Sequence, residues 1–185
     1  MSIVDNILKD VKFYKPQSKS EKEHKRQIVN FIEKNKIVLG SKNTKGHLTA
    51  SAWIVNQDIN KVLLHHHVAF NKWIQLGGHT EEKENIKKAA MREAREESGL
   101  TSLKLLSDNI FDLDVHSIPA RGQKQEHYHY DIRYIFTVDD SEKIKKTHES
   151  NKIAWIELNE IRLHRGRIYF EDGQKDRKIF CLLNL

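Results

Sequence analysis

The N-terminal part of the chain has apolar residues at helical spacing. Residues 2–14 predict a short amphipathic helix. A second helix is predicted over residues 20–35, because Ser20 and Glu23 form a capping-box pattern in front of an apolar face. We therefore expect residues 1–40 to form an N-terminal helical segment that precedes the main domain.

After this segment the pattern changes to the alternation that is typical of strands. Strands are predicted over residues 47–55, 61–68, 103–106, 110–115, 127–138 and 152–155. A strand-like piece over residues 73–76 runs into a predicted turn at Gly77–Gly78. Helical structure is predicted over residues 83–98, with Gly99 as its C-cap, and over 157–163 and 174–183. This mixture of strands and helices predicts an α/β or α+β fold.

Composition narrows the class of protein. The chain has 185 residues, of which 38% are hydrophobic and 31% charged, as is typical of one ordered domain. No apolar run approaches the roughly 18 residues of a membrane span, and we expect no secretory signal. Cys181 is the single cysteine and cannot form an internal disulfide, so we expect a cytoplasmic protein. The net charge of +6 favours an anionic partner.

Three glutamates share one face of the helix predicted over residues 83–98. Glu93, Glu96 and Glu97 are i, i+3 and i+4 neighbours, so they fall within one sector of the helix. Clustered carboxylates repel one another, and a hard divalent cation such as Mg²⁺ would relieve that repulsion. A solvated charged face is the alternative interpretation of a glutamate-rich helix.

A longer motif surrounds these glutamates. Residues 78–100 read GHTEEKENIKKAAMREAREESGL and follow the spacing G-x5-E-x7-R-E-U-x-E-E-x-G-U, where U is aliphatic. The matching positions are Gly78, Glu84, Arg92, Glu93, Ala94, Glu96, Glu97, Gly99 and Leu100. The pattern resembles the Nudix box of the Nudix hydrolases, and Ala94 is smaller than the aliphatic residue that is commoner there. A looser resemblance extends over about residues 44–163 and does not cover residues 1–40.

The resemblance implies a fold and a reaction. Nudix proteins fold as an α/β/α sandwich with a mixed sheet, which implies a Nudix hydrolase domain over residues 41–185 after the N-terminal helical extension. The implied reaction is hydrolysis of a diphosphate linkage in a nucleoside diphosphate derivative. Such a reaction requires neutralisation of phosphate charge, which bound Mg²⁺ or Mn²⁺ supplies.

The resemblance also assigns roles within and next to the box. The implied ligands of Mg²⁺ or Mn²⁺ are the backbone carbonyl of Gly77 and the side chains of Glu93, Glu96 and Glu97. Glu93 has a second implied role, that of the general base. Glu84 and Arg92 match the residues that brace the metal site.

Residues 126–131, EHYHYD, supply candidates outside the box. In a strand, His127, His129 and Asp131 point to one face, and Glu126 points to the other. Asp131 or Glu126 is a candidate to complete the metal site or to act as the base. His127 and His129 are candidates for contacts with the substrate phosphates, and Asp131 is a further candidate for substrate binding. The alternative is a polar strand face that contacts solvent.

Three further features are weaker candidates. Trp73 stands just before Gly77–Gly78 and is a candidate to stack on a nucleotide base, with a place in the core as the alternative. Residues 65–67 are consecutive histidines, which we interpret as a strand end rather than a transition-metal site. The basic residues near 162–167 predict either a polyphosphate contact or a solvated face.

Together these observations predict a cytoplasmic, metal-dependent Nudix pyrophosphohydrolase. Its expected partner is a small nucleotide diphosphate substrate, such as ADP-ribose or a nucleoside triphosphate. A membrane or nucleic-acid partner is not expected, and a homodimer is one option for the assembly. A non-catalytic Nudix-fold binding or regulatory module is an alternative that the intact glutamates disfavour. An isoprenoid diphosphate isomerase, a relative that shares the fold, is disfavoured. Its chemistry uses an active-site cysteine before the box, whereas Cys181 lies after it.

Overall fold

Two capped helices begin the chain. The computed structural model describes residues 2–164 and 167–170, with side chains described up to Ile161. Helix α1 (Ile3–Phe13) follows Ser2, which forms a reciprocal capping box with Asp5. Both helices predicted in this segment are present.

Helix α2 (Lys19–Lys34) begins two positions earlier than its predicted cap implied. The N-cap is Ser18, whose backbone is extended and whose hydroxyl accepts a hydrogen bond from the N–H of Glu21 at 3.1 Å. The predicted capping box at Ser20 is wrong, because Ser20 already lies inside the helix, where its hydroxyl lies 3.0 Å from the Ser18 hydroxyl.

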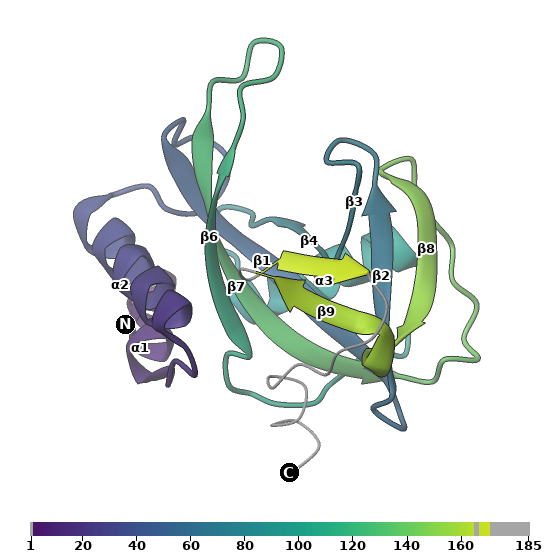
Figure 1. Cartoon of the computed structure of the whole chain (residues 1–185). Coiled ribbons are helices and arrows are strands. Elements are labelled where there is room, and N and C mark those ends of the chain that lie inside the picture. Colours follow the sequence, from purple (N-terminus) through teal and green to yellow (C-terminus); the bar gives the residue numbers. More distant parts are fainter. Residues whose placement is uncertain (1, 165–166, 171–185) are drawn as a thin grey trace. The chain divides into compact units, whose positions relative to one another are not determined.

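Helix α2 packs along α1 and against strand β6 (Asp112–Ile118), as Figure 1 shows. The ring of Phe31 stacks on the ring of Tyr130 with centroids 4.0 Å apart. On the same helix, Nδ1 of His24 lies 3.1 Å from the backbone oxygen of Leu113. The N-terminal helices are therefore fixed by both apolar and polar contacts.

The described residues also form ten strands and one further α-helix. The other strands are β1 (Gly46–Asn56), β2 (Lys61–His67), β3 (Lys72–Ile74), β4 (Leu76–His79), β5 (Lys104–Leu105), β7 (His127–Val138), β8 (Ser150–Glu157), β9 (Ile161–His164) and β10 (Arg167–Phe170). The larger sheet has the order β3-β2-β1-β7-β5, while β4 pairs with β1, β6 with β7 and β8 with β2. Strands β9 and β10 form a separate antiparallel pair.

The chain divides into two compact units. The first contains the described residues up to Ala52 together with Gly77–Glu93 and Ser107–Tyr134. Its antiparallel pair β6–β7 runs from Asp112 opposite Arg133 to Ile118 opposite His127. This register places His127 and His129 of β7 opposite the C-terminal end of β6.

The second unit contains Trp53–Leu76, Ala94–Leu106 and the described residues from Ile135 onward. Strand β2 is central to it and pairs antiparallel with β3, β8 and the last part of β1. Its middle residues Val62, Leu63 and Leu64 are fully buried, as a strand with neighbours on both sides requires.

An α/β fold with a mixed sheet and preceding helices is thus confirmed. The strand over residues 127–138 has its predicted bounds, whereas Gly77–Gly78 lie inside β4 rather than in a turn. In the stretch predicted to be helical at 157–163, only Leu158–Glu160 forms a 3₁₀ turn, and β9 follows it. The helix predicted over residues 174–183 lies outside the described residues. None of the helices in the described part is long and apolar enough to cross a membrane.

Candidate metal centre

Helix α3 (Ile86–Ser98) carries the three glutamates of the acidic stripe. Its first turn is capped by Asn85, whose side-chain oxygen accepts hydrogen bonds from the N–H groups of Lys87 and Lys88 at 3.0 and 3.2 Å. Gly99 ends the helix with φ of +71°, and its N–H donates to the Arg95 carbonyl at 2.8 Å. The predicted C-cap at Gly99 is confirmed.

The three glutamates differ in their exposure. Ala89 and Ala90, one turn earlier, are fully buried, so this side of the helix packs closely against its surroundings. Glu97 is only 5% exposed, Glu93 is half-buried and Glu96 is exposed. A buried carboxylate is costly unless polar groups or a cation surround it. Among the three, Glu97 is the member that lies deepest in the fold.

Arg92 connects the loop before α3 to the acidic stripe. Its guanidinium donates to both carboxylate oxygens of Glu84, at 3.0 and 2.9 Å, and to Oε1 of Glu93 at 2.8 Å. It also donates to the backbone oxygen of His79 at 3.0 Å. Paired, charge-assisted hydrogen bonds of this kind fix geometry as well as charge. Arg92 therefore holds the Glu93 carboxylate in one orientation.

The charges of this group are stable at neutral pH. The hydrogen bonds from Arg92 lower the pKa of Glu84, although partial burial alone would raise it. The Glu84 hydrogen bonds and the nearby Glu93 raise the pKa of Arg92. Glu84 is thus a carboxylate and Arg92 a cation near neutral pH.

Two glycines of β4 allow unusually close backbone approaches. A methyl group at Gly78 would lie 2.6 Å from Oε2 of Glu93. At Gly77 φ is +151°, and a Cβ atom would lie 2.5 Å from Oγ of Ser51. Gly77 therefore requires glycine, whereas a side chain at Gly78 would displace the Glu93 carboxylate. The Glu93 carboxylate rests directly on the backbone of Gly78, next in the chain to the predicted carbonyl ligand at Gly77.

Asp131 lies inside the first unit and accepts a hydrogen bond from Ser51, which faces Gly77. It is 2% exposed and accepts hydrogen bonds from Oγ1 of Thr49 at 2.9 Å, Oγ of Ser51 at 2.8 Å and Nε of Arg133 at 2.9 Å. Ser51 is also the residue that a side chain at Gly77 would meet. These contacts favour a positioning role for Asp131, and its contact with substrate stays a prediction.

In the second unit, Glu97 lies beside His65 of β2. Nδ1 of His65 is 3.9 Å from Oε1 of Glu97 and 2.7 Å from the hydroxyl of Ser150. Burial, and then the neighbouring His67 and His66, lower the pKa of His65 to about 4. His65 is therefore uncharged at neutral pH, so its contact with Glu97 is not an ion pair there.

The remaining candidates lie on different elements. Trp73 in β3 is partly exposed, its ring meets His66 edge-on with centroids 5.7 Å apart, and Nζ of Lys152 lies 6.0 Å from it. Glu126 accepts a hydrogen bond from the Ser117 hydroxyl at 2.5 Å. Base stacking by Trp73 stays a prediction. The side chains of the basic residues 162–167 lie outside the described part.

His127 and His129 meet a histidine that local sequence patterns did not single out. The ring centroid of His47 in β1 lies 5.3 Å from that of His127 and 4.9 Å from that of His129. His79 is a further neighbour, 4.8 Å from His47. Partners so far apart in the chain leave no local periodicity, although 11 histidines in 185 residues were a clue.

Comparison with known proteins agrees with this geometry. A family model described as the NUDIX domain matches residues 45–178, which is more than half of the chain. A protein of Lactococcus lactis subsp. cremoris (strain MG1363), named as a probable DHNTP pyrophosphohydrolase, is 29% identical over 119 residues, covering 63% of this chain and 69% of that protein. The chain therefore belongs to the Nudix family, as a Nudix pyrophosphohydrolase.

Solved structures with similar folds include two hydrolases. A C. elegans Ap4A hydrolase in a binary complex is 21% identical, with a TM-score of 0.48, over 60% of this chain and 80% of that one. The E. coli dihydroneopterin triphosphate pyrophosphohydrolase is 18% identical, with a TM-score of 0.47, over 66% of this chain and 84% of that one.

Proposed function

We propose that this protein uses Mg²⁺ or Mn²⁺ to hydrolyse the diphosphate linkage of a small nucleotide-like triphosphate. The observation that carries the proposal is the fixed position of Glu93. Arg92 donates to one of its carboxylate oxygens at 2.8 Å, and the other lies against the backbone of Gly78. A carboxylate held in this way is preorganised for a ligand or for a proton.

The donor atoms fit a hard divalent cation. Glu93, Glu96 and Glu97 offer carboxylate oxygens from one helix, and the Gly77 backbone offers a carbonyl oxygen. Oxygen ligands are what Mg²⁺ prefers, and the space at Gly78 that a Cβ would fill is occupied by a carboxylate instead. We assign these four residues as the cation's ligands, braced by Arg92 and Glu84.

The chemistry requires a water molecule, a base and a leaving group. Water attacks one phosphorus of the linkage, a new P–O bond forms, and the bond from that phosphorus to the bridging oxygen breaks. The bridging oxygen leaves with the electron pair as part of the departing phosphate or pyrophosphate. Glu93 is the candidate to take the proton of the water, because its position is fixed. The bound cation neutralises phosphate charge and lowers the pKa of the attacking water.

The name of the Lactococcus lactis relative supports the substrate class. The Lactococcus protein is named for a triphosphate, so we place a triphosphate ahead of a nucleotide sugar such as ADP-ribose. The net charge of +6 is consistent with a strongly anionic substrate. Trp73, His127 and His129 are the candidates for contacts with the substrate.

A substrate panel tests the proposal. Dihydroneopterin triphosphate, ATP, GTP, ADP-ribose and p-nitrophenyl phosphate are each incubated with the enzyme in Mg²⁺, in Mn²⁺ and in EDTA. We expect pyrophosphate or monophosphate from a triphosphate in the presence of a cation, and no product in EDTA. Phosphate release from the monoester alone would overturn the assignment.

A matched pair of variants tests the role of Glu93. Glu93→Gln keeps the shape of the side chain but removes its charge, so turnover is expected to fall by at least about 100-fold. Glu81→Gln makes the same change at an exposed position shortly before Glu84 and is expected to leave turnover unchanged. Equal turnover in the two variants would contradict the assignment of Glu93.

A further inference from the structure

Five histidines of the first unit gather around one point. The rings of His47, His127 and His129 form a triangle with centroids 4.9–5.3 Å apart. His79 lies 5.3 Å and His116 lies 5.5 Å from His129. One ligand atom from each member of the triangle lies within 4.8 Å of the other two. The box glutamates do not belong to this cluster.

Buried ring nitrogens of this cluster lack hydrogen bonds. His47 is 3% exposed, and neither of its nitrogens meets hydrogen-bond geometry with any group in the described part of the chain. Nε2 of His129 is in the same situation. Burial of an imidazole nitrogen without a hydrogen-bond partner is unfavourable, so a ligand for these nitrogens would stabilise the cluster.

The tautomer of His127 is fixed by its own contact. Its Nδ1 lies 2.9 Å from the backbone oxygen of Gln125, and a carbonyl only accepts, so Nδ1 carries the proton. The lone pair of His127 is therefore on Nε2. An imidazole whose other nitrogen donates to a carbonyl is the usual arrangement of a histidine that binds a metal.

The rings are in the protonation state that a metal requires. Burial first, and then the charge of the neighbouring histidines, lower the pKa of His47 to about 4, although the Asn43 backbone acts in the opposite direction. Burial followed by His116 and the other rings lowers the pKa of His129 to about 2. Neutral imidazole is the form that binds metal, and burial of these rings disfavours the charged form.

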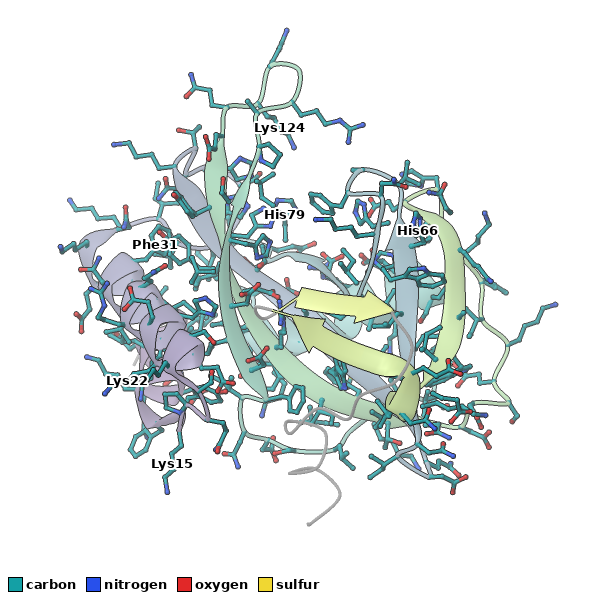
Figure 2. All side chains as sticks on the ribbon, in the orientation of Figure 1. Lys15, Lys22, Phe31, His66, His79 and Lys124 are labelled. Carbon is teal, nitrogen blue, oxygen red and sulfur yellow. The ribbon has the colours of Figure 1, made fainter. Side chains whose placement is uncertain are left out.

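The cluster opens onto a polar cavity. The cavity has a volume of about 500 Å³ and is lined by His47, His79 and His127 together with Lys124 and Asn43. His79 and Lys124 are labelled in Figure 2. An ion held by the three rings would keep a coordination position open to this cavity, with a lysine nearby for an anionic ligand.

We propose that His47, His127 and His129 form a second metal site, for Zn²⁺, separate from the carboxylate site of the box. Three imidazoles suit a zinc ion with an open position, whereas Mg²⁺ favours oxygen ligands. With Zn–N bonds near 2.1 Å, two nitrogens on one ion stand about 3.4 Å apart, so ligand atoms that lie up to 4.8 Å apart approach one another by up to about 1.4 Å on binding. His127 is the ring with room to move, because it is partly exposed.

Zinc binding is measured on the full chain after treatment with EDTA and transfer to millimolar Mg²⁺, with a fluorescent chelator as competitor. About one equivalent of Zn²⁺ is expected to bind, and His127→Asn and His129→Asn are each expected to weaken it at least tenfold. His148→Asn, at an exposed position, is the matched control and is expected to have no effect. Unchanged binding in both cluster variants, or none in the wild type, overturns the proposal.

Two further measurements separate this site from the proposed catalytic one. X-ray absorption at the zinc edge of the wild-type protein is expected to report imidazole nitrogens near 2.0–2.1 Å, and a shell of oxygens alone would overturn the proposal without any variant. Glu93→Gln is expected to retain zinc binding while it loses turnover with Mg²⁺. Loss of zinc binding in Glu93→Gln would place the ion at the box and contradict the histidine site.

Discussion

The carboxylate of Glu93 occupies the space that any side chain at Gly78 would need, since a methyl group there would stand 2.6 Å from Oε2. This contact makes Gly78→Ala a test of the site that leaves every candidate ligand in place. We expect the alanine to displace Glu93 and to lower cation-dependent turnover at least tenfold, because small misplacements of catalytic groups are costly. Steady-state kinetics with Mg²⁺ measures the effect.

Gly40→Ala is the control for Gly78→Ala. Gly40 has φ of +69°, so alanine is strained there by about 1 kcal/mol, but no atom lies closer than 3.5 Å to the new Cβ. We expect a lower melting temperature with normal turnover. Equal losses of turnover in the two variants would mean that instability, rather than the position of Glu93, explains the result.

Cation binding to the carboxylate stripe should stabilise the fold. Mg²⁺ or Mn²⁺ at millimolar concentration is expected to raise the melting temperature, because the cation binds the native state and relieves repulsion among Glu93, Glu96 and Glu97. For a chain of this size, each kcal/mol corresponds to about 2–4 °C. Differential scanning fluorimetry in Mg²⁺ and in EDTA measures the shift.

The double variant Glu96→Gln, Glu97→Gln should lose most of this stabilisation by Mg²⁺. Glu97→Gln alone is expected to lower turnover by orders of magnitude and to keep the circular dichroism spectrum of the wild type. Glu81→Gln, exposed in the loop before α3, is expected to respond to Mg²⁺ as the wild type does. A thermal shift of the same size in the double variant would show that the cation binds elsewhere.

Asp131→Asn is expected to affect stability as well as turnover. Asp131 pairs with Arg133 at 2.9 Å while it is 2% exposed, so the loss of its charge should cost about 2–3 kcal/mol. Turnover should fall because the amide replaces one of the two acceptor oxygens by a donor, which cannot accept from Arg133 or from Ser51, the residue that faces Gly77. Urea unfolding and kinetics are measured together, with Tyr128→Phe at an exposed position as the control. Full stability with reduced substrate affinity would instead favour direct contact of Asp131 with substrate.

The stability of the first unit should depend on pH through Arg133. Its guanidinium pairs with Asp112 at 2.8 Å and with Asp114 and Asp131 at 2.9 Å. Burial alone would raise the pKa of Asp114, but Arg133 and then His116 overcome this effect and hold that pKa well below its usual range. The folded pKa is lower than the unfolded one, so this stabilisation is complete above about pH 4 and is lost as the pH falls further.

Arg133→Gln removes the cation and leaves three buried or half-buried carboxylates. We expect a loss of about 3 kcal/mol or more at pH 7. Without the cation, the like charges that remain should raise the pKa of Asp114, so the gap between variant and wild type should narrow as the pH falls toward 4. Urea unfolding over this pH range measures the gap. Arg26→Gln, which removes an exposed ion pair with Glu23, should change little, and a gap that widens toward acid would contradict the assignment.

Local sequence signals predicted the helices and most strands because those signals are local. The strand over residues 127–138 and the C-cap at Gly99 are determined by side-chain alternation and by backbone geometry within a few residues. The N-cap of α2 shows the limit of such signals. Ser18 and Ser20 are both suitable N-cap residues, and only the backbone conformation identifies Ser18 as the cap. Gly77–Gly78 suggested a turn, but tertiary contacts with Ser51 and Glu93 explain the glycines.

The candidate site was predictable where one helix carries it. The spacing of Glu93, Glu96 and Glu97 places them on one face, and no tertiary information was needed for that inference. The pairing of His47 with His127 joins residues that lie far apart in the chain, and it depends on how strands meet in the sheet. The sequence placed His127 and His129 on one strand face as candidate site residues, but no local pattern connected them to His47.

The stacked rings of Phe31 and Tyr130 have a practical meaning for anyone who designs expression fragments. The family match starts at residue 45, whereas the first compact unit already includes α1 and α2. A fragment cut at the family boundary would lack α2. The ring of Tyr130 would lose the ring of Phe31 that covers it, and the backbone oxygen of Leu113 would lose its contact with His24. The strand that presents the histidines on one side is backed by these helices on the other. Fragments for deletion libraries and for crystallisation should therefore include Ser2, the N-cap of α1, and all residues that follow it in the first unit.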